Sequence, residues 1–484
     1  MQARLLSRET GDHSPDDLSK SVNADLLRSF APAPQHRFNG EIASQTHLEE
    51  TEERARSVRA HGAGVSGLAL EKFDGRILVS GGSEGSIKIW DLDEAPTPNQ
   101  RHVFRPVSTI ARSTGVKKVN GHSHGITHLA FYPFDPDAFL SSSYDKSLKL
   151  WATQRSALTA DFHLNATIYS HAMSPIADHL LVSCATQHSN VRLVDLKSGS
   201  AVQALVAHGG PVLCTSWSPR HEHILASGHA DGKVRIWDIR RAGGVIAQLD
   251  QEDSLGVLHR FRHATALDQD WSSMPHFRTS AQAHDEAVNG LQWTDDAKYI
   301  VSAGLDRKIR VWDAGTGANT LASFGALIQN RHAKTATMVV TSSGLSNNKE
   351  ILIWPNDQEI LLLDLHDGNV ITRLRSPGST NPVGPRGGEL GRNRTTTIVW
   401  RGAGGGPGQI GTVMGGGNSV GAIYSAHLDG QIRAWMPQIP GPDDIDETED
   451  IDEDEETRRR KRKAVDNAYR SLMGRQITFT GTSR

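Results

Sequence analysis

The sequence contains very little cysteine, with only Cys184 and Cys214 among its 484 residues. Two cysteines cannot form the disulfide framework of a small secreted domain, and their scarcity favours a reducing compartment, the cytosol or the nucleus. No run of 18 apolar residues occurs, so no membrane-spanning helix is expected. The charged residues Arg4, Arg8 and Glu9 interrupt any signal-peptide core, so none is expected there either.

The chain also lacks an excess of either charge, with 52 basic and 55 acidic residues. Eleven of the acids lie in residues 443–456, and six consecutive bases form residues 458–463. When both runs are set aside, 46 basic and 44 acidic residues remain. A body this close to neutrality has no overall electrostatic footprint for nucleic acid. Direct DNA binding would therefore need a local basic patch.

A repeated pattern is the most informative feature of the sequence. It consists of a turn with an acidic or polar residue, then alternating basic and apolar residues, then Trp-Asp or a relic of it. Seven copies occur, ending near Asp91, Trp151, Asp195, Trp237-Asp238, Trp312-Asp313, Asp364 and Trp435. The alternation has a period of two residues, which predicts a β-strand for each copy.

Each copy follows further β-rich segments, such as RILVSGG at 76–82 and ILASGH at 224–229. His-Gly or similar turns lie further upstream, for example at His61-Gly62 and His208-Gly209. This order is typical of the four-stranded blade of a WD-repeat protein. The sequence therefore predicts an all-β, seven-bladed WD-repeat β-propeller over residues 50–437. It adds a short N-terminal helical extension and a disordered C-terminal tail.

The histidine, serine, aspartate and tryptophan of each blade resemble a hydrolase triad only superficially. In WD repeats such residues satisfy one another's buried polar atoms and tie the strands together. This structural role is the expectation for His61, Asp145, His208, Asp231, His284 and Asp306. Blades with Val194 in place of tryptophan, or with Ala152 or Met436 in place of aspartate, should have weaker networks.

Ring closure and two inserts can also be placed. The last copy ends on an inner strand, so its blade needs one more outer strand, which we expect from residues 54–60. Residues 251–280 and 376–421 are expected to be inserted loops. The second loop contains GAGGGPG, but it lacks the Gly-Lys-Ser/Thr ending of a phosphate-binding loop.

The first 45 residues differ from the repeats. Ser14, Pro15 and the acids Asp16 and Asp17 form a helix start, with a cap, a proline in the first turn and negative charge at the positive end of the dipole. An apolar stripe then follows at steps of four residues: Leu18, Val22, Leu26 and Phe30. The stripe either packs on the flank of the propeller or docks in the groove of a partner.

The tail, residues 438–484, has the composition of a disordered segment. Its bases form a candidate nuclear localisation signal, so the nucleus is the expected location. A solvated charge run, or screening of the bases by the acidic run, are the alternatives. The bases are Arg458, Arg459, Arg460, Lys461, Arg462 and Lys463.

No catalytic constellation or cofactor motif stands out. The histidine pairs His122/His124 and His221/His223 lack a cysteine or carboxylate at metal-ligand spacing. We therefore expect no metal, no cofactor and no enzymatic activity from this chain.

The fourth copy carries a motif that separates classes of propeller. It reads DGKVRIWDIRRAGG, with Arg240 two residues after Asp238. This Trp-Asp-X-Arg ending resembles the box of the substrate receptors of type-four cullin ubiquitin ligases. Stretches such as LLSRETG at 5–11 and SWSPRHEHILASGHADGKVRIWDIRRAGG at 216–244 resemble, within these receptors, the Cockayne syndrome group A family.

The resemblance implies a substrate receptor in transcription-coupled nucleotide excision repair. The implied partners are the large damaged-DNA-binding adaptor, the cullin and its RING subunit through that adaptor, the Cockayne syndrome group B ATPase, and stalled RNA polymerase II. The residues implied to bind the adaptor lie in the first 45 residues and at the Arg240 corner: Leu5, Leu6, Leu18, Val22, Leu26, Phe30, Trp237, Asp238, Arg240 and Arg241.

Two other functions stay open. The chain could be a scaffold in another nuclear complex, for RNA processing or chromatin, without a link to ubiquitin. It could also recognise DNA directly, through the arginine-rich loop around Arg386, Arg392 and Arg394.

Overall fold

The computed structural model describes the parts of the chain that form a ring and one helix. The described residues are 14–41, 59–94, 101–114, 120–241, 245–255, 281–342, 344–346, 350–375, 394–402 and 420–438. The chain divides at Pro437 into a unit that contains the ring and a C-terminal unit. The tail, the candidate localisation signal and most of both inserts lie outside the described residues.

Seven antiparallel sheets form the blades of the ring. From the innermost strand outward, blade 1 contains β3 (Val65–Leu70), β4 (Ile77–Gly82), β5 (Ile87–Asp91) and β7 (Pro106–Ile110). Blade 2 contains β8 (Ile126–Phe131), β9 (Ala138–Ser143), β10 (Ser147–Ala152) and β11 (Ala157–His163). Blade 3 contains β12 (Ile168–Met173), β13 (Leu181–Thr186), β14 (Val191–Asp195) and β15 (Ser200–Leu205).

The remaining blades are less regular. Blade 4 contains β16 (Val212–Trp217), β17 (Ile224–His229), β18 (Val234–Asp238) and β19 (Val245–Gln248). Blade 5 contains β20 (Val288–Trp293), β21 (Tyr299–Gly304) and β22 (Ile309–Asp313), and blade 6 contains β23 (Val339–Val340), β24 (Ile351–Pro355), β25 (Glu359–Asp364) and β26 (Val370–Arg375). Blade 7 contains β27 (Thr395–Arg401), β28 (Ala422–His427), β29 (Ile432–Pro437) and β1 (Phe30–Pro32). Short 3₁₀ turns lie at Leu92–Glu94 and Gly325–Leu327.

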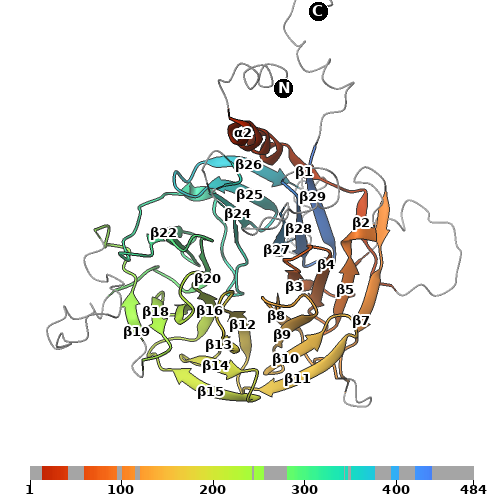
Figure 1. Cartoon of the computed structure of the whole chain (residues 1–484), viewed down its shortest axis with the longest axis horizontal. Coiled ribbons are helices and arrows are strands. Elements are labelled where there is room, and N and C mark those ends of the chain that lie inside the picture. Colours follow the sequence, from red (N-terminus) through yellow and green to blue (C-terminus); the bar gives the residue numbers. More distant parts are fainter. Residues whose placement is uncertain are drawn as a thin grey trace, which may run out of the picture. The chain divides into compact units, whose positions relative to one another are not determined.

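The first strands of the blades pack against one another around the axis of the ring (Figure 1), where β-propellers have a central channel. Side-chain hydroxyls link neighbouring inner strands: Ser66 donates to the carbonyl of Ile126 at 2.5 Å and Thr127 to that of Ile168 at 2.7 Å. Thr396 likewise donates to the carbonyl of Val65 at 2.6 Å, across the junction of blades 7 and 1. The predicted seven-bladed WD-repeat propeller is therefore confirmed.

The ring closes through a segment that the sequence did not indicate. Strand β1 pairs antiparallel with β29, with Phe30 opposite Pro437 and Pro32 opposite Trp435. The prediction that residues 54–60 supply the outer strand is therefore wrong. Three residues with a terminal proline have too weak a β signal to compete with the longer RARSVRA segment, yet proline is tolerated on an edge strand.

The N-terminal segment continues onto blade 1 after it has completed blade 7. Strand β2 (His36–Phe38) pairs in parallel with β6 (His102–Phe104). Phe38 is buried and lies edge-on to Trp90, with ring centroids 5.3 Å apart, and it stacks on Phe104 at 4.8 Å. Residues 30–38 therefore fasten the two blades that meet at the closure of the ring.

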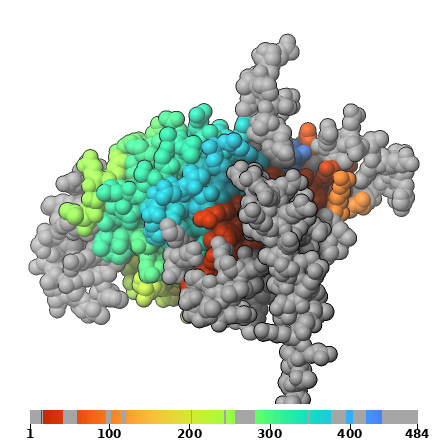
Figure 2. All heavy atoms as spheres, turned by 90° about the horizontal axis from the view of Figure 1, so that it is seen from above, coloured from red at the N-terminus to blue at the C-terminus, as the bar shows by residue number. Residues whose placement is uncertain are grey.

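Helix α2 (Pro15–Arg28) begins as predicted. The Ser14 hydroxyl accepts a hydrogen bond from the Asp17 amide at 3.1 Å. The helix lies along the outer edge of blades 6 and 7, against β26 and β29, and its red atoms contact the cyan atoms of blade 6 in Figure 2. Leu27, 1% exposed, and Phe30, 5% exposed, enter the core of these blades, and Asn23 donates to the Leu345 carbonyl at 3.0 Å.

The two faces of the ring differ in the turns that they carry. Because the strands are antiparallel, the turns from first to second strand and from third to fourth strand lie on one face. Arg240 follows the third strand of blade 4, so we call this side the Arg240 face. The remaining turns form the opposite face. Leu345 follows the first strand of blade 6 and Phe30 pairs with the end of a third strand, so helix α2 contacts the ring at the Arg240 face.

Candidate protein-docking site

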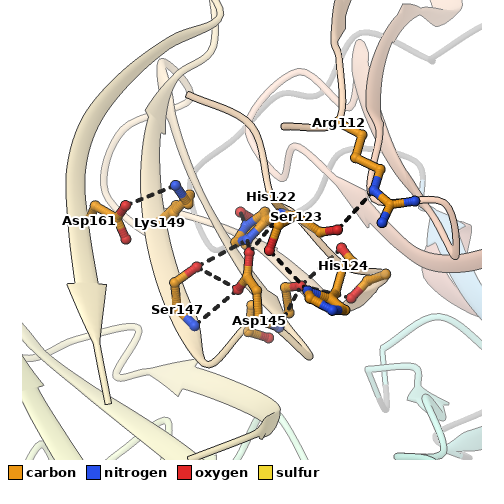
Figure 3. Close-up of polar contacts among 12 residues, drawn as sticks. Arg112, His122, Ser123, His124, Asp145, Ser147, Lys149 and Asp161 are labelled. Carbon is orange, nitrogen blue, oxygen red and sulfur yellow. Dashed lines mark hydrogen bonds and ion pairs between the residues drawn. The ribbon is translucent and has the colours of Figure 1, made fainter. Parts of the chain in front are cut away.

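Polar residues of the repeats form buried networks near the opposite face of the ring, the one that faces away from Arg240. In blade 2, His122 contacts Asp145 at 2.9 Å (Figure 3). His122 also contacts the Ser141 hydroxyl at 2.7 Å, and the Trp151 indole donates to the same hydroxyl at 2.7 Å. In blade 5, His284 contacts Asp306 at 3.0 Å. As in blade 2, a serine hydroxyl contacts the histidine and accepts a hydrogen bond from the tryptophan, here Trp312.

Blade 1 has glutamate in the acidic position. His61 contacts the Glu84 carboxylate at 2.6 Å and Ser80 at 2.8 Å, and Trp90 donates to Ser80. Burial alone would raise the pKa of Glu84, but the hydrogen bond and charge of His61 lower it to about 2. Burial lowers the pKa of His61, against the effect of Glu84. The serine hydroxyl is fully enclosed between histidine and tryptophan, which leaves no open side for a substrate.

Blade 4 differs from the expectation for His208. The His208 side chain is exposed, and only its carbonyl takes part, accepting from Arg235 at 2.8 Å. The buried histidine is His229, which contacts Ser227 at 2.8 Å. Asp231 pairs with Arg235 at 2.9 Å instead of with a histidine. A local pattern in the sequence was missed, a histidine two residues after the serine at the end of the second strand. Blade 7 has the same pattern, and there His427 contacts Ser425.

The degenerate blades are completed by other residues. Blade 3 has Val194 where tryptophan is usual, and its Ser183 accepts instead from Trp217 of blade 4 at 3.0 Å. In blade 6, Trp354 donates to Asn356 at 3.0 Å. In blade 3 the neighbouring blade therefore supplies the tryptophan donor that the blade itself lacks.

The Arg240 corner presents a fixed guanidinium group to solvent. Asp238 ends β18 and is 3% exposed, and it accepts from the Arg240 side chain at 3.0 Å (Nε) and 2.8 Å (Nη2) and from the Arg240 amide at 3.0 Å. The Arg240 side chain is 55% exposed, and Arg241 approaches the same carboxylate at 3.8 Å. Burial opposes ionisation, but these hydrogen bonds lower the pKa of Asp238. Trp237 is buried, so it supports this corner from within the blade.

Histidine residues of neighbouring turns lie beside this corner. His179 contacts the Glu222 carbonyl at 2.9 Å, and its ring stacks on that of His223 at 5.9 Å. Among the described residues, no group of three or more histidine, cysteine, aspartate or glutamate side chains could hold a metal ion.

Apolar side chains share the Arg240 face. Phe134 is 45% exposed after the first strand of blade 2, and Ile176 is 43% exposed after the first strand of blade 3. On helix α2 the apolar stripe divides: Leu26 and Phe30 pack on the ring, whereas Leu18 and Val22 are half-buried and outside its core clusters.

Some predicted residues cannot be placed. Leu5, Leu6, Arg386, Arg392 and Arg458–Lys463 lie outside the described residues. Arg394 is described, but it precedes the innermost strand of blade 7 and so lies at the central channel.

Known proteins share these features. The family model "WD domain, G-beta repeat" matches residues 52–91, 113–152, 199–238 and 276–313. WD repeat-containing protein ATCSA-1 of Arabidopsis thaliana is 30% identical over 55% of this chain and 70% of its own length. The chain belongs to the WD-repeat family. This family membership agrees with the repeats, the blades and the buried networks.

More distant relatives have other names. Radiation-sensitive protein 28 of Saccharomyces cerevisiae is 28% identical over 42% of this chain, and ribosome biogenesis protein YTM1 of Phaeosphaeria nodorum is 26% identical over 52%. The alignments span 41% and 54% of these two relatives. None of the three names is that of an enzyme.

The narrower resemblance, to the Cockayne syndrome group A family, is corrected by these matches. Proteins named for ribosome biogenesis match this chain at 24–26% identity, close to the 28% of the radiation-sensitive protein, so the matches do not single out one receptor family. Separately, no helix among the described residues is long and apolar enough to cross a membrane.

Proposed function

We propose that this WD-repeat protein is a non-catalytic substrate-receptor subunit of a cullin-RING ubiquitin ligase, acting in transcription-coupled nucleotide excision repair. It would hold the damaged-DNA-binding adaptor, and through it the cullin and RING subunit, on the Arg240 face. Substrates at stalled RNA polymerase II, with the Cockayne syndrome group B ATPase, would be held elsewhere. The names of two relatives, ATCSA-1 and radiation-sensitive protein 28, support a repair context.

One observation carries the proposal: the two features expected to bind the adaptor lie on the same face of the ring. Helix α2 contacts the ring at the Arg240 face of blades 6 and 7, and Arg240 lies on that face in blade 4. Exposed Phe134 and Ile176 add apolar area on that face in blades 2 and 3. A single partner surface could therefore contact all of them.

The chemistry of the corner suits protein recognition. The Asp238 carboxylate accepts hydrogen bonds from Nε and from one N–H of Nη2 of Arg240. The third guanidinium nitrogen, Nη1, makes no hydrogen bond to the described part of the chain. The guanidinium is thus held in one orientation with donors directed away from Asp238. Less side-chain entropy is then lost when a carboxylate or carbonyl of a partner binds it.

Apolar contacts should contribute more to affinity than the exposed charge. Buried aliphatic anchors usually dominate an interface, whereas a rim charge mainly affects association rate and specificity. Leu18 and Val22 are suitable anchors because they are only half-buried in the free chain. The nuclear location expected from Arg458–Lys463 fits this proposal.

The experiment should avoid deletion of the first 45 residues, because deletion would also remove β1 and open blade 7. A double substitution, Leu18→Gln with Val22→Gln, changes only the half-buried part of the stripe. Val206→Gln is the matched control, since Val206 is 61% exposed and lies on the opposite face.

The purified chain should bind the adaptor–cullin complex in a pull-down. The double substitution should weaken binding by at least about tenfold, and more than Arg240→Ala does, while Val206→Gln should have no effect. Failure of the wild-type chain to recover the adaptor and cullin would overturn the proposal.

A scaffold in ribosome assembly is the second candidate, favoured by the relatives that are named for ribosome biogenesis. It predicts that the chain co-sediments with ribosome precursors and that Arg240→Ala leaves this co-sedimentation intact. Recovery of the adaptor without such co-sedimentation would favour the ligase.

A further inference from the structure

A segment between blades 5 and 6 crosses the central channel. Residues 332–337 lie between the last strand of blade 5 and the first strand of blade 6, and this part of the chain runs inward to the middle of the ring (Figure 1). Asn289 of blade 5 donates to the carbonyls of His332 and Lys334 at 2.9 Å. The Thr335 hydroxyl donates to the Leu213 carbonyl of blade 4 at 3.0 Å.

The crossing segment also reaches blades 7 and 1. Thr337 contacts the Thr397 hydroxyl of blade 7 at 2.8 Å. The Lys334 ammonium donates to the Ser66 carbonyl of blade 1. The backbone of Lys334 is held by blade 5, so its side chain extends across the channel to the far wall.

Basic side chains surround this position. Burial, followed by the charge of Lys334, lowers the pKa of His128 of blade 2 to about 4, and Arg394, which precedes the first strand of blade 7, acts on Lys334 in the same way. His171 of blade 3 lies edge-on to His128, with ring centroids 4.7 Å apart. Lys334, His128 and Arg394 are partly exposed although they lie inside the ring, so they line a space that solvent reaches.

Several side-chain nitrogens of this cluster have no hydrogen-bond partner among the described residues. His128 Nδ1, His171 Nε2 and Arg394 Nε are buried and have no hydrogen-bond partner among the described residues. His171 is 2% exposed, and its other nitrogen contacts Ser142 at 3.1 Å. A buried donor or acceptor without a partner costs about 1–3 kcal/mol. These three nitrogens, on residues of blades 2 and 3 and at the start of blade 7, are therefore available to a ligand.

Charge points to the class of ligand. Among the described residues, Asp357 is the carboxylate that acts on Arg394, and none is a resolved influence on Lys334 or His128. Burial, followed by the charge of Arg394, lowers the pKa of Lys334 to about 7. A half-buried cation without a carboxylate beside it, such as Lys334, is unfavourable, and an anion would relieve this cost.

We infer that the central channel binds a phosphate-type oxyanion, held by Lys334, Arg394, His128 and His171. A tetrahedral anion has acceptor oxygens on every side, and the residues that would hold it belong to blades 2, 3 and 7 and to the crossing segment. A carboxylate offers two oxygens along one edge and would satisfy fewer of them. This inference does not depend on the proposed ligase function.

The test uses the full chain with inorganic phosphate and with pyrophosphate as probes. Binding is measured by broadening of the phosphorus NMR signal and by the thermal midpoint relative to sodium chloride of equal ionic strength, because a ligand of the folded state raises its stability. Lys334→Met and Arg394→Gln should each weaken binding at least about tenfold. Lys197→Met, on an exposed turn of blade 3, should leave it unchanged.

The outcomes are distinct. Equal affinity for the two probes identifies a single phosphate as the ligand, and tighter pyrophosphate binding identifies a phosphoester or polyphosphate. Absence of broadening with the wild-type chain would overturn the inference. Equal broadening with Lys334→Met, or with Arg394→Gln should the first variant fail to fold, would also overturn it.

Discussion

Strand β18 of blade 4 carries an arginine–aspartate pair at each end, and the two pairs have opposite burial. At the opposite face, Arg235 and Asp231 are 2.9 Å apart, and the arginine side chain is 4% exposed and the aspartate 21%. At the Arg240 face, Arg240 and Asp238 are 2.8 Å apart, with the arginine 55% exposed and the aspartate 4%. The two ion pairs therefore have similar distances between their atoms but different roles.

The difference shows how one strand can serve stability and recognition. A buried guanidinium uses its donors inside the protein, on Asp231 and on the His208 carbonyl. An exposed guanidinium on a buried aspartate is oriented by the protein, and donors remain available for a partner. We therefore expect substitutions at the first pair to change folding and those at the second to change binding.

The largest expected effect is that of Arg235→Met. The change leaves the Asp231 carboxylate and the His208 carbonyl without their partner, and breaking such a pair costs about 3 kcal/mol. The free energy of unfolding in urea measures this loss. A loss of less than about 1 kcal/mol would instead show that the Arg235–Asp231 pair contributes no more to stability than an exposed ion pair does.

Trp237→Phe should have the next largest effect. Trp237 is fully buried and donates to the Ser227 hydroxyl at 2.7 Å. Loss of volume and of one hydrogen bond should cost about 1–3 kcal/mol. A double-mutant cycle with Ser227→Ala should give a coupling of about 0.5 kcal/mol or more. Strict additivity would show that the bond contributes nothing.

The third prediction concerns the pH dependence of the free energy of unfolding, to which the two histidines of blade 4 should contribute differently. Burial, followed by the charge of Arg235, lowers the pKa of His229 from 6.5 to about 3. Between these values the unfolded chain binds a proton that the folded chain does not. The free energy of unfolding should therefore fall as the pH decreases below about 6.5.

His229→Gln should make this fall less steep, by up to about 1.4 kcal/mol per pH unit. His208→Gln is the matched control, because His208 is exposed, and it should leave the slope unchanged. Urea unfolding at several pH values between about 7 and 5 measures the slopes. Equal slopes for wild type and His229→Gln would contradict the assignment of His229 to the buried network.

The same blade shows what the sequence could and could not predict. The Trp-Asp copies predicted the ring because each copy is a strand with local alternation. The sequence did not distinguish His208 from His229, since both are followed closely by glycine or aspartate and only the three-dimensional packing buries one of them. The Arg240 motif was visible, but its fixed orientation depends on the burial of Asp238.

Contacts between residues that are far apart along the chain could not be predicted from the sequence. Strand β1 pairs with a segment about 400 residues away along the chain, and three residues carry too little periodicity to reveal it. The crossing segment over residues 332–337 contacts the inner strands of distant blades, and no local pattern encodes such contacts. For the same reason, Arg394 was assigned to the second insert, whereas it directly precedes the first strand of blade 7.

The smallest effect on stability should come from Arg240→Ala. Exposed ion pairs contribute about 0–1 kcal/mol, so the variant should unfold almost as the wild type does. Arg76→Ala is a matched control, because Arg76 is also 55% exposed on the aspartate that ends a third strand, Asp91. The two variants should have similar free energies of unfolding.

The most direct measurement of the central claim is the affinity of folded Arg240→Ala for the immobilised adaptor–cullin complex. Arg307→Ala is the comparison, since Arg307 is exposed on a turn of the opposite face. We predict that Arg240→Ala binds about five- to tenfold more weakly than wild type, whereas Arg307→Ala binds as wild type does. Equal affinities for all three proteins would contradict the claim that the Arg240 face holds the partner.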